Sequence, residues 1–263
     1  MKPVFIREMK LNVSQLLIWS FTVGGLGLVC VLMYRSMQGD MQEMADMFSH
    51  MGAFSDAFGM STLSIATLKG FFATEVGTVH GLGGGLFAAI LAIGIIAKEE
   101  DRHTGEFLLS LPISRTKTVA AKALSVLVML AVFTCVCTVL YALGFVMLGE
   151  EIPAGEFAVF MLRQLLMEIE VAAICFFISG LSGKINMGAG MGIVLFLYAF
   201  DLIGRVVPDA REYLFIGPYA YANASEIFAD ADTPVKALVI ACIVTVLSTG
   251  ATFFCYNKRD LAS

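Results

Sequence analysis

Three carboxylates interrupt long apolar stretches of this sequence. Glu168 and Glu170 lie within residues 157–181, and Asp201 lies within residues 187–207. A charged side chain at the centre of a membrane helix costs about 2.5–3.5 kcal/mol on insertion scales, so it either pairs with another polar group or lines a functional cavity. Both roles stay open for these carboxylates, which together form a candidate cavity.

Spacing along the chain offers partners for two of these carboxylates. Asp201 precedes Arg205 by four residues, which is the favourable order for an ion pair on one helix face. Arg163 precedes Glu170 by seven residues, which also places the two on one face of a helix. Glu168 has no clear partner within its own stretch, so it is the best candidate for lining a polar cavity.

A methionine stripe offers a second kind of chemistry. Its members recur at steps of three and four residues, which predicts one face of a helix within the long segment 36–74. Thioether sulfurs bind copper(I), but a packing or membrane-contact face is far commoner, and we predict no metal site. The stripe consists of Met37, Met41, Met44, Met47 and Met51.

The sequence argues against two kinds of catalytic or nucleotide-binding site. Residues 180–183, Gly-Leu-Ser-Gly, match the serine motif of rhomboid-type proteases, which need a histidine base from a later helix, whereas all three histidines precede Ser182. The sequence also lacks the Gly-x-x-x-x-Gly-Lys-Ser/Thr loop that cradles nucleotide phosphates. We therefore expect no covalent chemistry and no cofactor in this chain.

The elements that position these residues are expected to be membrane helices. Of the 263 residues, 58% are apolar or aromatic and 15% are charged, whereas soluble domains are about 45–50% apolar with glycine counted. A spanning helix needs about 20 mostly apolar residues. The expected fold is all-α, a single bundle of six transmembrane helices that forms one domain over residues 1–263. The spans are expected at residues 15–34, 76–97, 123–148, 157–181, 187–207 and 237–256.

The basic residues predict the orientation of the bundle. Cytoplasmic loops of membrane proteins carry an excess of Lys and Arg, and an even number of spans places both termini on one side. Eleven of the 17 basic residues fall on that side, so both termini are expected in the cytoplasm and the chain in the cell (plasma or inner) membrane. The sequence has no basic run, which argues against a nucleic-acid partner. The eleven are Lys2, Arg7, Lys10, Lys98, Arg102, Arg115, Lys117, Lys122, Lys184, Lys258 and Arg259.

Residues 98–122 form the only substantial polar loop on the predicted inner side. Gly105 breaks the loop, residues 106–111 are compatible with a short helix, and Pro112 ends that helix. Ser114 can cap the helix that follows. Acids and bases beside leucines give a charged surface with an apolar knob, which suits docking on another protein.

This loop carries a resemblance to a known family. Residues 98–115, Lys-Glu-Glu-Asp-Arg-His-Thr-Gly-Glu-Phe-Leu-Leu-Ser-Leu-Pro-Ile-Ser-Arg, with Lys122 after them, resemble the first cytoplasmic loop of the type-2 export permeases of ATP-binding-cassette (ABC) transporters. Weaker similarities lie in residues 7–10, 217–219 and 258–261. The resemblance therefore covers nearly the whole chain, but only the loop is specific.

The resemblance implies that the loop contains a coupling helix that docks on a separate soluble ATPase subunit, which binds ATP and Mg. It also implies a second permease, identical or related, which Gly188 and Gly192 are candidates to contact. The implied substrate leaves by export, and an antimicrobial peptide, a drug or another hydrophobic or cationic compound would fit. The coupling interface would comprise Glu99, Glu100, Arg102, Gly105, Glu106, Leu108, Leu109, Pro112, Ser114 and Arg115.

Two other functions are alternatives to export. An ion-coupled secondary transporter would use Glu168, Glu170 and Asp201, and inverted internal repeats would support it, but the sequence shows none. A non-transporting membrane assembly protein is the second alternative.

Overall fold

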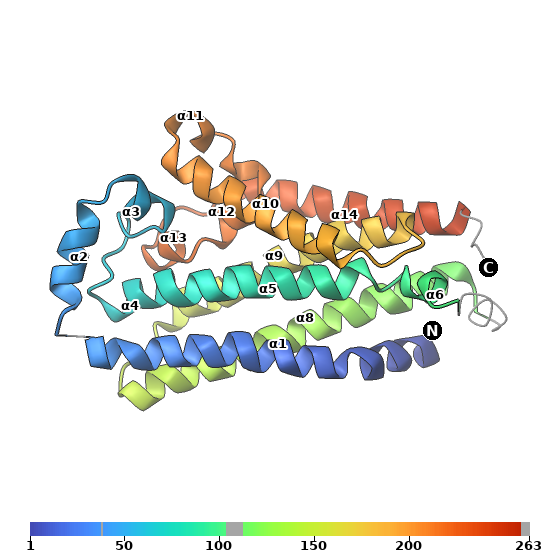
Figure 1. The fold of residues 1–263 in the computed structure, drawn as a ribbon, viewed down its shortest axis with the longest axis horizontal. Coiled ribbons are helices and arrows are strands. Elements are labelled where there is room, and N and C mark those ends of the chain that lie inside the picture. Colours follow the sequence, from blue (N-terminus) through green and yellow to red (C-terminus); the bar gives the residue numbers. More distant parts are fainter. Residues whose placement is uncertain (38, 104–112, 259–263) are drawn as a thin grey trace.

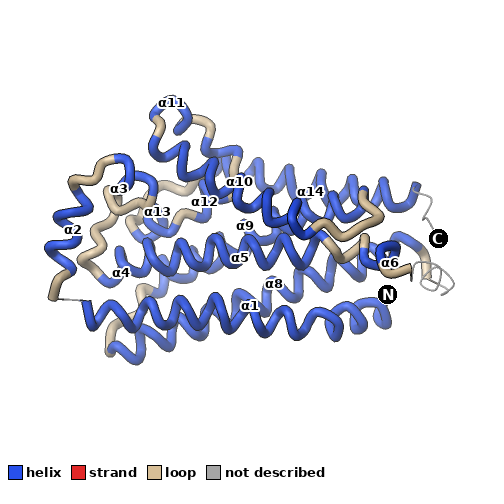
Figure 2. The backbone as a smooth tube through the Cα atoms, in the orientation of Figure 1, coloured by secondary structure: helices blue, strands red, loops and turns tan. Residues whose placement is uncertain are grey.

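The computed structural model describes residues 1–37, 39–103 and 113–258. Figure 1 shows an elongated bundle of long helices, with the chain beginning and ending at the same end of the bundle. Over the described residues, Figure 2 shows helices and loops without a strand. The all-α architecture expected from the composition is therefore confirmed for the part of the chain that the structure describes.

Within the described residues, six helical segments are long and apolar enough to cross a membrane, as predicted. The first is 36 residues long, about 54 Å at 1.5 Å per residue, against a hydrocarbon core of about 30 Å. It starts well before the expected residue 15, and of the residues before that position Val4 and Glu8 are buried against the bundle. The six segments are α1 (Lys2–Met37), the run Leu68–Ile93, α8 (Arg115–Leu148), α9 (Ala154–Leu181), α10 (Met187–Val206) and α14 (Val235–Lys258).

The second span is a composite. It comprises α4 (Leu68–Phe71), a π-helical turn (Phe72–Val76) and α5 (Gly77–Ile93). Phe72 is completely buried and lies at the centre of an aromatic cluster, with ring centroids 5.3–5.9 Å from five neighbours. Those neighbours are Tyr141, Phe145, Phe157, Phe160 and Phe228.

Short helices gather at the two ends of the bundle (Figure 1). The helix α6 (Lys98–Asp101) lies at the end with the termini. The opposite end carries α2 (Met41–Ser49), α3 (Ala53–Ala57), α11 (Pro208–Arg211), a 3-10 turn (Leu214–Ile216), α12 (Tyr219–Ala222) and α13 (Ala224–Phe228).

The methionine stripe is divided between two helices. Met37 ends α1, and the stripe resumes in α2. Met41 is buried in a small cluster with Tyr34 and Phe71, whereas Met47 is exposed. The predicted amphipathic helix is therefore present, and its apolar face is partly used for packing on the bundle.

Burial ranks the helices by their position. In the most apolar stretch of each span, 61% of the residues are buried in the run Leu68–Ile93 and in α9, against 22% in α10 and 11% in α14. The bundle is thus built around α5 and α9, and α10 and α14 present most of their surface outward. Close approach of α1 and α8 depends on glycines, because a Cβ at Gly24 would lie 2.6 Å from Leu140 Cδ1 and one at Gly144 would lie 2.9 Å from Val31 Cγ1.

Candidate functional site

Four charged side chains join three helices at the end of the bundle that carries both termini. We call Glu8, Lys98, Glu99 and Lys122 the root cluster; they come from α1, α6 and α8. Lys122 Nζ lies 2.7 Å from Glu99 Oε2 and 3.2 Å from Glu8 Oε1. Lys98 Nζ pairs with Glu8 Oε2. Every member is buried, with Glu8 at 0% and Lys122 at 1% exposed.

Mutual pairing makes the burial of the root cluster tolerable. Two carboxylates face two ammonium groups, and the partly exposed Arg7 guanidinium lies 3.7 Å from Glu99 Oε1, so each buried charge has an opposite charge beside it. A buried ion without its partner costs several kcal/mol. Burial lowers the pKa of Lys98, and the Glu8 carboxylate opposes that shift. Lys122 Nζ also donates to the carbonyl oxygen of Ile95, just beyond the last turn of α5, where helices leave carbonyls unsatisfied. The cluster therefore fixes the start of loop 98–122 to both α1 and α8.

A second buried polar group lies between the long helices. We call His80, Thr134, Tyr141 and Glu168 the core polar cluster; they come from α5, α8 and α9. His80 Nε2 lies 3.2 Å from Glu168 Oε1, and Thr134 Oγ1 donates to Glu168 Oε2 at 3.1 Å. His80 Nδ1 lies 2.9 Å from the Tyr141 hydroxyl. His80 and Glu168 are both 0% exposed.

Glycines make room for the core polar cluster. A Cβ at Gly84 would overlap the Glu168 carboxylate, and a Cβ at Gly27 would overlap the Tyr141 ring. The neighbouring Gly83 allows close packing of α5 against α1, since a Cβ there would lie 2.6 Å from Val23 Cγ2. At Gly84 the neighbour is a charged group rather than another backbone, so the glycine serves the cluster as much as the packing.

The other two carboxylates have partners in different places. Glu170 Oε2 accepts from the Tyr221 hydroxyl at 2.9 Å. Asp201 forms the predicted pair with Arg205, whose Nε lies 2.8 Å from Asp201 Oδ2 and whose second nitrogen lies 3.1 Å from Oδ1. Arg205 also binds Glu226 Oε1 at 2.9 Å. Two acids thus share one guanidinium at the end of the bundle opposite the termini.

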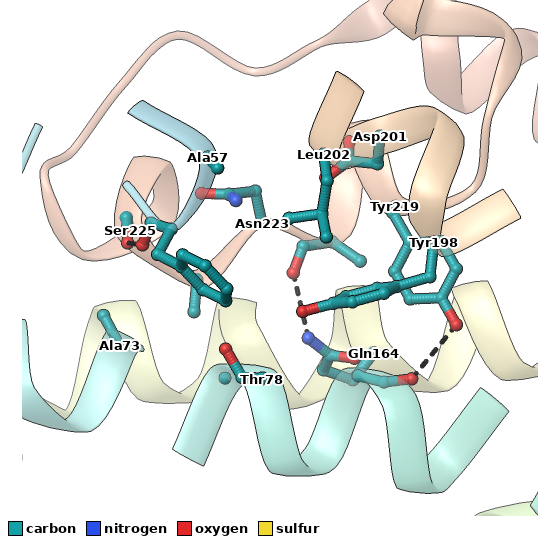
Figure 3. Close-up of a pocket in the computed structure, with 15 residues that line it drawn as sticks. Ala57, Ala73, Thr78, Gln164, Tyr198, Asp201, Leu202, Tyr219, Asn223 and Ser225 are labelled. Atoms are coloured by element: carbon teal, nitrogen blue, oxygen red, sulfur yellow. Dashed lines mark hydrogen bonds between the residues drawn. The ribbon is translucent and has the colours of Figure 1, made fainter. Parts of the chain in front are cut away.

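A small cavity lies beside Asp201, and Figure 3 shows its lining. Its volume is about 50 Å³. The side chains around it come from α5, α9 and α10 and from the short helices at this end of the bundle. They include Thr78, Gln164, Tyr198, Tyr219 and Asn223 as well as Asp201.

The comparison with known families decides what kind of protein carries these groups. The sequence model of the ABC-2 family transporter proteins matches residues 3–261, nearly the whole chain. The chain belongs to the ABC-2 transporter family. No curated protein matches it. Family membership together with six apolar helices makes it a multi-pass cell-membrane protein of the permease type.

The loop residues of the ABC-2 permease fall into three groups. Glu99 belongs to the root cluster and Glu100 is also buried, so both carboxylates are directed into the protein. Arg102 is exposed at the end of α6. Ser114 caps α8 as predicted, since its side chain accepts from the Lys117 amide at 3.4 Å. Arg115, the first residue of α8, is half-buried. Gly105, Glu106, Leu108, Leu109 and Pro112 lie outside the described residues.

The three candidate carboxylates of the permease do not converge on one cavity. Asp201 lines the cavity of Figure 3, whereas Glu168 is enclosed by α5 and α8 and Glu170 is bound to α12. The predicted pair between Arg163 and Glu170 is wrong. Arg163 donates to Thr233 Oγ1 at 3.2 Å, and Glu170 accepts from the Tyr221 hydroxyl instead. Seven residues of separation share a helix face, but tertiary neighbours compete for each side chain.

Sequence reasoning missed most of the partners in both clusters. His80 precedes Glu168 by 88 positions, and Glu8 precedes Lys122 by 114, so no local spacing connects them. The available signal was chemical: His80 is a polar residue inside an apolar stretch, and an intramembrane ionisable group implies a partner.

Proposed function

We propose that the chain is the transmembrane permease subunit of an ABC exporter, which couples ATP hydrolysis by a separate ATPase subunit to efflux of a substrate. Membership of the ABC-2 family is the observation that carries the proposal. In this proposal the chain performs no covalent chemistry, and ATP and Mg bind to the partner ATPase. Both termini and loop 98–122 lie in the cytoplasm.

The root cluster supports coupling through this loop. A loop that transmits force must be joined to the spans by something stiffer than a flexible chain. Glu99 and Lys98 attach the first turn of the loop to α1 and α8 through buried ion pairs. At its other end the loop continues directly into α8, which begins at Arg115 behind the Ser114 cap. A displacement of the loop by an ATPase would therefore reach α1 and α8 together.

The roles of the loop residues divide accordingly. Arg102 and Arg115, together with Leu108, Leu109 and Pro112, make the surface that meets the ATPase. Glu99 transmits the motion rather than contacting the partner, because it is 3% exposed and bound to Lys122. This division refines the interface implied by the loop sequence.

A second permease, identical or related, completes the pore in this proposal. The faces available to it belong to α10 and α14, which are the least buried spans. Gly192 on α10 has open space where a Cβ would stand, which suits close approach of a neighbouring helix. The proposed cargo is a hydrophobic or cationic compound such as an antimicrobial peptide or a drug.

Copurification with the ATPase tests the proposal. We expect Leu109→Asp and Arg115→Glu to abolish capture of a coexpressed ATPase whose gene neighbours that of the permease. Lys184→Glu is the matched control, because Lys184 is exposed in the loop between α9 and α10 and lies outside the proposed interface. Capture that survives both loop substitutions contradicts docking, and transport in proteoliposomes without any ATPase contradicts the function itself.

A further inference from the structure

The cavity beside Asp201 is lined by a buried hydrogen-bond acceptor for which the described residues supply no donor. Gln164 is 2% exposed and lines the cavity. Its Nε2 donates to the carbonyl oxygen of Ala222 at 2.9 Å, which fixes the orientation of the amide. Its Oε1 is buried and has no hydrogen-bond partner. Because buried polar atoms in folded proteins are nearly always satisfied, Oε1 calls for a donor that enters the cavity.

The charges around the cavity favour a cation. Asp201 is the one charged residue among those that line the cavity, and it is 5% exposed. Its partner Arg205, which also pairs with Glu226, does not line the cavity. A positive ligand in the cavity would be attracted by the Asp201 carboxylate, whereas an anion would be repelled by it.

The lining also selects among cations. Tyr198 and Tyr219 stand edge to face beside the cavity, with ring centroids 5.4 Å apart, and aromatic rings attract ammonium groups. Figure 3 shows the side chains of Tyr198, Tyr219 and Gln164 among those that line the cavity. Hard metal ions need six or more oxygen ligands, and no three His, Cys, Asp or Glu side chains of the described residues converge to hold a metal ion. An ammonium group needs only a few acceptors.

We propose that this cavity binds the ammonium group of an organic amine, with Gln164 Oε1 as its principal hydrogen-bond acceptor and Asp201 as its counter-charge. The volume of about 50 Å³ admits a group of about three to five water-sized atoms. The cavity therefore recognises the charged end of an amine, and the remainder of a larger amine extends beyond it. As a recognition site for cationic cargo the inference rests on the proposed export function, but the binding itself does not.

Thermal unfolding of the purified permease with methylammonium chloride tests the site. Ligand that binds only the folded state raises the unfolding temperature in a saturable manner. We expect such a rise with methylammonium and not with sodium chloride at equal ionic strength. Tetramethylammonium carries the same charge without an N–H donor, so we expect it to have no effect. A rise with tetramethylammonium equal to that with methylammonium overturns the proposal, as does the absence of any rise beyond that with sodium chloride.

Substitutions locate the binding. Gln164→Met keeps the length of the side chain and removes the acceptor, so we expect an apparent affinity at least about tenfold weaker, the effect of one hydrogen bond to a charged group. Asp201→Asn serves as a second variant if Gln164→Met does not fold, and it should weaken binding in the same direction. Gln42→Met on exposed α2 is the matched control and should bind as the unaltered protein does.

The outcomes separate this inference from the proposed function. An undiminished methylammonium effect in both Gln164→Met and Asp201→Asn overturns the amine site and leaves the docking of an ATPase untouched. Failure of the permease to capture the ATPase contradicts the export function but does not bear on methylammonium binding, because the binding assay contains no ATPase.

Discussion

The root cluster and the core polar cluster both connect helices through buried polar groups, but they lie at different depths of the bundle. Each joins three helices through buried polar side chains, and α8 takes part in both. The root cluster uses two Lys and two Glu side chains at the end with the termini. The core polar cluster uses one Glu, one His and two hydroxyl groups farther inside.

The difference follows from the cost of charge. A lysine ammonium has to be matched by a carboxylate, because an isolated buried ion costs several kcal/mol. The core polar cluster instead contains one carboxyl group, which keeps the Thr134 hydroxyl as a partner when His80 is removed. We therefore expect the removal of one partner to destabilise the protein more in the root cluster than in the core polar cluster.

Removal of Lys122 is expected to have the largest effect. Lys122→Met removes the buried ammonium group that bridges Glu8 and Glu99 and leaves Glu99 with the partly exposed Arg7, so we expect a loss of about 3–5 kcal/mol in the free energy of unfolding. Reversible unfolding of the purified permease in mixed micelles measures it. The control is Lys117→Met on the exposed face of the same helix, which should change stability by less than about 0.5 kcal/mol. Equal effects of the two substitutions would mean that the root cluster contributes nothing specific.

Removal of His80 should cost less. His80→Leu leaves Glu168 with only the Thr134 hydroxyl, but the carboxyl group can take up a proton and become neutral. We therefore expect a loss of about 1–3 kcal/mol, the cost of an unsatisfied buried group, in the same unfolding measurement. A loss as large as that of Lys122→Met would contradict the distinction between the two clusters.

Crowding of the core polar cluster should produce an effect of similar or smaller size. A Cβ at Gly84 would overlap the Glu168 carboxylate, so Gly84→Ala should destabilise the protein by about 1–2 kcal/mol through displacement of the carboxylate. Gly25→Ala on α1 is the matched control, because nothing lies within 4 Å of a Cβ there. The thermal midpoints of the two variants give the comparison, and a lower midpoint for Gly25→Ala than for Gly84→Ala would contradict the expectation.

A surface ion pair provides the lower limit of the comparison. Lys69 Nζ lies 2.8 Å from Glu156 Oε1, with side chains 48% and 30% exposed. Exposed pairs contribute about 0–1 kcal/mol, so Lys69→Met should change the unfolding free energy by no more than about 1 kcal/mol. A double-mutant cycle with Glu156→Gln isolates the pair. A coupling energy near that of the root cluster would show that burial does not explain the ranking.

The sequence predicted those features that depend on neighbours within a few residues. Hydropathy predicted the six spans, and the four-residue spacing predicted the pair between Asp201 and Arg205, since one turn of helix brings them together. The Ser114 cap was also predictable, because it depends on an amide three residues away. The length of the first helix was not predicted, since α1 extends over the polar residues before the expected span.

Composition and local spacing by themselves determined that the chain is a helical membrane protein, where its spans lie, and that loop 98–122 is its distinctive polar segment. Only the tertiary structure decided that Glu8 meets Lys98 and Lys122, that Glu168 meets His80, and that Glu170 turns to Tyr221 instead of Arg163. The physical reason is that helix periodicity fixes which residues share a face, whereas the packing of faces distant in sequence determines which polar atoms come within hydrogen-bonding distance of one another.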